Sequence, residues 1–97
     1  MPTLQEVQDI VTARAKGRIK GTVRLDMPDL GTLWVDETGA KISDDDAEIT
    51  LTARSDVFHN IVLGTQNPAT AFMTGKLKVD GNPMRALKIG EILSTDP

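Results

Sequence analysis

The sequence offers few side chains that could carry out covalent or metal chemistry. His59 is the single histidine and cysteine is absent, so a transition-metal site would have to combine His59 with carboxylates. A lone imidazole without a placed partner also lacks the geometry that a general base needs. We therefore interpret His59 as a solvated residue on the polar side of a helix, and we predict no metal ion and no cofactor.

Serine and acidic residues offer no stronger site. The run Ser43 to Asp46 lacks the alternating ligands, central glycine and distal glutamate of a calcium loop, which favours an acidic turn. Ser43, Ser55 and Ser94 stand in no nucleophile-elbow context and have no second histidine as base. Short glycine pieces do not form a phosphate-binding loop between a strand and a helix. We predict that the protein is not an enzyme.

Length and composition favour one folded domain over residues 1–97. The chain has 97 residues, of which 39% are hydrophobic and 26% charged, as in an ordinary globular protein. No apolar run approaches the length of a membrane-spanning helix, and the N-terminal segment is unlike a secretory signal. We expect a soluble, cytoplasmic protein, and the net charge of −3 argues against a nucleic-acid binder.

Basic residues gather in two groups along the chain. The first contains Arg14, Lys16, Arg18, Lys20 and Arg24, and the second contains Lys76, Lys78, Arg85 and Lys88. Solvated surface is the ordinary interpretation of such residues. An alternative is peripheral contact with an anionic membrane, which attracts polybasic segments.

Hydrophobic periodicity predicts an α+β domain. A capping box formed by Thr3 and Glu6 begins the first helix, and Gly17 ends it. Ser55 and Asp56 are expected to cap the second helix. The expected helices cover residues 3–16, 57–64, 67–73 and 83–93, and the expected strands cover residues 18–27, 31–37, 40–43, 47–53 and 75–81.

The closing helix carries more apolar surface than one face can hold. Arg85, Lys88 and Glu91 form a narrow polar strip, so the apolar surface exceeds the stripe that a helix resting on a sheet needs. Gly90 costs about 1 kcal/mol relative to alanine, and we expect this helix to be the element most easily loosened. The surplus could meet a ligand, a membrane or a second subunit, or simply complete a small core, which the residues alone favour.

Several short sequence motifs precede the closing helix. An Asn-Pro helix start at residues 67–68 is followed by Ala71-Phe72, the run Gly75 to Val79 and a Gly-Asn turn at residues 81–82. In this order and spacing the features resemble the sterol carrier protein type 2 family. The likeness is continuous from about residue 15 to 93.

The resemblance implies a five-stranded, mostly antiparallel sheet of order 3-2-1-4-5 with helices on one face and the fourth strand parallel to the first. It also implies a hydrophobic cavity between sheet and helices that binds a fatty acyl chain, fatty acyl thioester, phospholipid or sterol for transfer. A polar head group is expected at the surface near Arg85 or Lys88. The candidate cavity residues are Leu51, Phe58, Ile61, Val62, Phe72, Met73, Leu77, Val79, Met84, Leu87 and Leu93.

A second function uses the same apolar surface for protein contacts. The chain would then be a non-catalytic dimerisation or accessory domain, and we expect a monomer or a weak homodimer. Trp34 bears on this alternative, because it points away from Leu33 and Val35 toward the open side of the sheet. Either it lies against a neighbouring lysine or arginine stem, or it makes a dimer contact.

Overall fold

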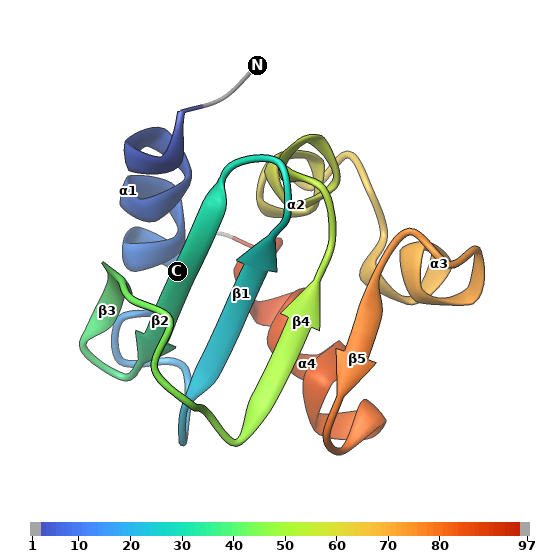
Figure 1. Ribbon diagram of the computed structural model, residues 1–97. Coiled ribbons are helices and arrows are strands. Elements are labelled where there is room, and N and C mark those ends of the chain that lie inside the picture. The colour runs from blue at the N-terminus through green and yellow to red at the C-terminus, as the bar shows by residue number, and fades with distance from the viewer. Residues whose placement is uncertain (1–2, 96–97) are drawn as a thin grey trace.

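The computed structural model describes residues 3–95, in which one helix is followed by four strands, two helices, a fifth strand and a last helix (Figure 1). The helices are α1 (Leu4–Ala15), α2 (Ser55–Val62), α3 (Pro68–Met73) and α4 (Pro83–Leu93). The strands are β1 (Val23–Met27), β2 (Gly31–Asp36), β3 (Gly39–Ile42), β4 (Ile49–Thr52) and β5 (Lys78–Asp80).

The strands form one sheet in the order β3-β2-β1-β4-β5. β1 is antiparallel to β2 and parallel to β4, with Val23 opposite Val35 on one side and Ile49 on the other. The other two pairs, β2 with β3 and β4 with β5, are antiparallel. The expected strand order and the single parallel pair are therefore confirmed.

One face of the sheet is buried and the other is open. Along β1, β2 and β4 the buried residues alternate with partly exposed ones, as expected for strands covered on one side. Figure 1 views the sheet from its open face, with α4 behind it. The inward side chains of the strands join those of α1, α2 and α4 in one hydrophobic cluster. The helices α1, α2 and α4 thus lie on one face, as the α+β prediction requires, and α3 lies beside β5 at the edge of the sheet (Figure 1).

Local caps begin three of the four helices. The side chains of Thr3, Asn67 and Asn82 each accept hydrogen bonds from N–H groups in the first turn of α1, α3 and α4. Such bonds satisfy amide groups that have no partner within the helix. At the other end of α1, Gly17 takes a positive φ of 73°, in agreement with its expected role as a helix terminator.

The start of α2 corrects the expectation that Ser55 and Asp56 cap it. Ser55 is the first residue of the helix and is fully buried. Its N–H and its hydroxyl donate to the two carboxylate oxygens of Asp29, at 2.9 and 2.6 Å. Asp29 lies in the turn between β1 and β2, so a residue distant in sequence caps this helix. These bonds, chiefly the one from the hydroxyl, lower the pKa of Asp29.

The first strand begins at Val23, five residues later than expected. Residues 16–22 instead form a loop between α1 and β1, in which Gly21 has a φ of 80° that strand geometry does not allow. Ile19 is buried all the same, because the loop turns this side chain into the core. Alternation of polar and apolar residues therefore continues through a segment that is not a strand.

Gly90 also has a different role from the one expected. It is buried, and a Cβ atom built on it would lie 2.8 Å from Cβ of Pro68 in α3. The absence of a side chain lets α3 approach α4, so Gly90 is a packing position rather than a simple weak point.

We predict that Gly90→Ala does not stabilise the protein, although alanine is the better helix former. The gain in helix propensity is about 1 kcal/mol. The overpacking against Pro68 costs about 1–3 kcal/mol. Urea unfolding should therefore show an unchanged or lower free energy of unfolding, whereas Glu91→Ala, at the exposed neighbouring position, should leave it nearly unchanged. A clear stabilisation by Gly90→Ala would contradict the packing role.

We predict that Asp29→Asn lowers the melting temperature at neutral pH but not in strong acid. Because folding lowers the pKa of Asp29, its ionised form stabilises the folded state above the ordinary carboxyl pKa. That contribution is lost as the pH falls through the lowered pKa. Melting curves from about pH 7 to about pH 2.5 should therefore converge for the two proteins. A difference that stays constant across this range would contradict the prediction.

Candidate functional site

The structure divides the eleven candidate cavity residues into three sets. The buried set is Leu51, Phe58, Ile61, Val62, Leu77 and Leu93. Val79 and Leu87 are partly exposed. Phe72, Met73 and Met84 are exposed, with 37%, 84% and 81% of their surface accessible.

The buried set belongs to the same packed cluster as the inward side chains of the sheet. None of the three surface grooves described below is lined by any of the eleven residues. Met73 and Met84 face solvent, whereas Phe72 is more than half covered, and none of the three belongs to the core cluster. A role of the eleven residues in ligand binding stays a prediction.

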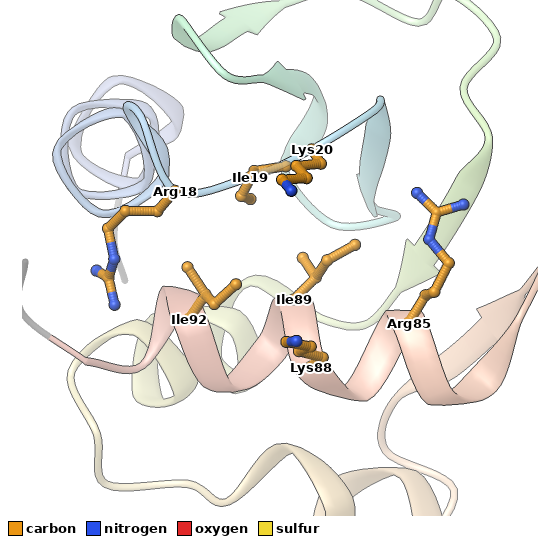
Figure 2. Close-up of a pocket in the computed structure, with 7 residues that line it drawn as sticks. All are labelled: Arg18, Ile19, Lys20, Arg85, Lys88, Ile89 and Ile92. Carbon is orange, nitrogen blue, oxygen red and sulfur yellow. The ribbon is translucent and has the colours of Figure 1, made fainter.

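A groove of about 300 Å³ lies between α4 and the loop of residues 16–22 (Figure 2). It is lined by Arg18, Ile19, Lys20, Arg85, Lys88, Ile89 and Ile92. We call it the α4 groove. The loop supplies one bank and the helix the other, so two segments from opposite ends of the chain form it.

Helical spacing explains which residues α4 presents. Side chains three or four residues apart lie on the same flank of a helix. Four residues of α4 at this spacing line the groove: Arg85, Lys88, Ile89 and Ile92. On the other bank, Ile19 turns inward while Arg18 and Lys20, on either side of it, remain at the surface. Each bank therefore contributes both apolar and basic side chains.

The α4 groove has an apolar floor and a basic rim. Ile19 and Ile89 are 2% and 6% exposed and belong to the core cluster, and Ile92 packs against it. The floor is therefore the outer surface of the core itself. The rim unites members of the two basic groups that the sequence separates, and such a site suits an amphiphile with an anionic head.

The four basic residues of the rim differ in their partners. The Arg18 guanidinium donates to the carbonyl and hydroxyl oxygens of Thr95, both at 2.7 Å, just beyond the end of α4. Nη1 of Arg85 lies 3.0 Å from Oε2 of Glu48. Within residues 3–95, Lys20 and Lys88 form no ion pair. Their ammonium groups are therefore available to a ligand.

The expectation of a head group near Arg85 or Lys88 thus coincides with the rim of the α4 groove. The groove itself could not be found from sequence, for two reasons. The alternating pattern predicts a strand at Ile19, and the placement of Ile89 on the opposite bank depends on how α4 packs. The placement of the apolar Ile19 between the basic residues Arg18 and Lys20 was the one sequence signal for this bank of the groove.

A second groove, of about 270 Å³, lies near β4, β5 and the start of α2. Pro28, Ala53 and Val57 supply apolar surface, and Lys76 and Lys78 stand among the lining residues. Arg54 also lines this groove and lies 3.5 Å from a carboxylate oxygen of Asp56.

Trp34 borders a third and smaller groove of about 180 Å³ on the open face of the sheet. Its indole Nε1 donates to the carbonyl of Asp46 at 3.1 Å, and Nζ of Lys41 lies 4.7 Å from the ring centroid. Trp34 therefore contacts a neighbouring lysine through its ammonium group, and packing against the lysine stem stays a prediction. His59 lies half-buried on α2, and residues 3–95 contain no acidic, histidine or cysteine group suited to a metal ion.

The family model described as the SCP-2 sterol transfer family matches residues 4–94. The chain belongs to this family. A curated member, the fatty acid-binding protein of Yarrowia lipolytica, is 49% identical over 55 residues, which are 57% of this chain and 43% of that protein. The match thus spans less than half of the relative's length.

Solved structures show the SCP-2 fold in proteins of different sizes. Apo sterol carrier protein 2 from Yarrowia lipolytica is 29% identical, with a TM-score of 0.63 over 94% of this chain and 75% of that one. Sterol carrier protein 2 of Aedes aegypti in complex with palmitate is 19% identical, with a TM-score of 0.76 and 94% of both chains covered.

An inverting sec-alkylsulfatase from Pseudomonas sp. contains the same fold as a small part of a larger chain. The TM-score is 0.61 at 18% identity, covering 89% of this chain and 14% of that one. The fold therefore occurs both alone and within larger proteins. In the part of this chain that the structure describes, no helix is long and apolar enough to cross a membrane.

Proposed function

We propose that this SCP-2 family domain binds and transfers a lipid with a long acyl chain and an anionic head group. The observation that carries the proposal is the α4 groove, whose floor is the exposed side of the core and whose rim is basic. Family membership and the named ligands of its relatives, fatty acid and palmitate, support the same class of ligand.

The apolar part of the ligand would supply most of the binding free energy. Each methylene group moved out of water contributes about 0.8 kcal/mol, so ten contribute about 8 kcal/mol before ordering costs. A volume of about 300 Å³ is at the small end for ligand sites, so the groove holds part of a long chain. The remainder would enter between sheet and helices, where the buried candidate residues Phe58, Ile61 and Leu93 belong to the same core cluster as Ile19 and Ile89 of the floor.

The rim would hold the head group at the surface. Lys88 stands on α4 opposite Lys20 on the loop, so a carboxylate above the apolar floor would meet an ammonium group from either bank (Figure 2). This binding needs no reacting group. We therefore propose a non-catalytic carrier formed by a single domain over residues 1–97, and a cytoplasmic location stays a prediction.

We predict that Lys88→Glu weakens the binding of palmitate about tenfold or more, because a favourable charge becomes a repulsive one. Displacement of a fluorescent fatty acid measures the affinity, and native mass spectrometry of the purified protein shows whether lipid is retained. Lys76→Glu makes the same charge change in the second groove and should leave the affinity within about twofold. Absence of saturable binding by the wild-type protein would refute the proposed function.

The second candidate function is that of an accessory or dimerisation domain. It is favoured by the exposure of Met73 and Met84, and by the occurrence of the fold within a larger enzyme chain. Sedimentation at several concentrations separates the two functions. A dimer that persists on dilution and is split by a charge substitution at Leu87 would support this candidate over the carrier.

A carrier must also meet the membrane from which it takes its ligand, and the region around the end of α3 has suitable side chains. Phe72 and Met73 are exposed on this helix, and Lys76 lies three residues after Met73, its last residue. Exposed apolar side chains beside cations favour the surface of an anionic bilayer. We propose peripheral contact of this region with such membranes.

We predict that the protein binds vesicles containing phosphatidylserine better than neutral vesicles, and that high salt removes this preference by screening. The double variant Met73→Ser with Lys76→Gln should reduce binding severalfold. Ile42→Ser, which removes an exposed apolar side chain at the other edge of the sheet, is the matched control. Equal loss in the two variants, or equal binding to both vesicles, would argue against this contact.

A further inference from the structure

We propose that Glu48 sets the selectivity of the α4 groove for the charge of the head group, by occupying Arg85 when no anionic ligand is bound. This inference rests on the proposed function of the groove. It concerns a residue that does not line the groove but lies against one of its basic residues.

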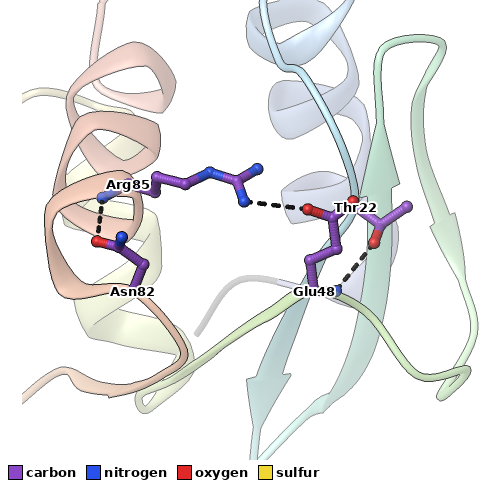
Figure 3. Close-up of polar contacts among 4 residues, drawn as sticks. All are labelled: Thr22, Glu48, Asn82 and Arg85. Atoms are coloured by element: carbon purple, nitrogen blue, oxygen red, sulfur yellow. Dashed lines mark hydrogen bonds and ion pairs between the residues drawn. The ribbon is translucent and has the colours of Figure 1, made fainter.

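The Glu48–Arg85 pair joins α4 to the sheet at one end of the groove (Figure 3). Nη1 of Arg85, in the first turn of α4, lies 3.0 Å from Oε2 of Glu48, which directly precedes β4. Arg85 is also a lining residue of the groove. One guanidinium group therefore faces both an internal carboxylate and the place where we expect the head group of a ligand.

The backbone of each partner is fixed, whereas the side chains can move. The Arg85 N–H donates to the Asn82 side chain at 3.2 Å, and the Glu48 N–H donates to the Thr22 hydroxyl at 2.9 Å. The two side chains are 47% and 53% exposed. An ion pair with this exposure is weak, because water screens it. Arg85 can therefore leave Glu48 for another anion without disturbing the backbone.

Gly21 provides the room in which the pair lies. A Cβ atom at this position would come within 3.0 Å of Nη2 of Arg85 and of both carboxylate oxygens of Glu48. The pair thus passes directly over the bare backbone of the loop that forms the other bank.

Two consequences follow for ligands of the same length. An anionic head group must compete with Glu48 for Arg85, although Lys20, Lys88 and Arg18 attract it. A neutral head group does not compete for Arg85. Glu48 thus lowers the preference that the basic rim alone would give to anions, and so keeps neutral lipids among the ligands.

The test compares palmitate with hexadecanol, which share a chain length and differ in head-group charge. Affinities are measured for the wild type, Glu48→Gln, Arg85→Gln and the double variant. Glu48→Gln should tighten palmitate binding about fivefold, equivalent to about 1 kcal/mol, and leave hexadecanol within about twofold. Arg85→Gln should weaken palmitate binding, and in that background the change at Glu48 should have little further effect.

The outcomes separate this inference from the proposed function. Wild-type binding of palmitate with no tightening by Glu48→Gln would overturn the inference alone. The same tightening for both ligands, or tightening that persists when Arg85 is absent, would also overturn it, because Glu48 would then act by another route. A wild-type chain that binds neither probe would overturn the proposed function and this inference with it. Melting curves check that each variant is folded.

Discussion

The candidate site depends on the apolar floor to which Ile19, in the loop of residues 16–22, and Ile89, in α4, both contribute. Both side chains are almost fully buried and belong to the core cluster, yet both also form the floor of the α4 groove. The core and the site therefore share a surface. Any ligand that enters more deeply must cover these apolar side chains with its own apolar groups, so one apolar environment replaces another.

Polar contacts hold both ends of α4 beside this floor. At its first turn Arg85 pairs with Glu48, and beyond its last turn Thr95 accepts hydrogen bonds from Arg18. The pair at the first turn is half exposed and contributes little to stability, whereas a buried isoleucine contributes about 1.5–3 kcal/mol. The apolar floor thus determines how firmly α4 is held, and the polar contacts determine which charges surround it.

The local structure of the chain could be predicted because its signals are short-range. Caps at Thr3 and Asn67 act within three residues of their partners, and two-residue alternation identifies the strands. The order of motifs around Phe72 to Leu93 identified the family, and through it the strand order. The segment before Val23 was misassigned, because alternation also occurs in a loop that buries Ile19.

The sequence by itself determined the element order, the family, and the presence of two basic groups and an apolar closing helix. Only the tertiary structure decided that Asp29 caps α2, that Gly90 accommodates Pro68, and that the basic groups meet around an apolar floor. It also decided that Met73 and Met84 face solvent. The physical reason is that periodicity records which side of an element is apolar. A groove forms where two elements distant in sequence pack together without filling the space between them.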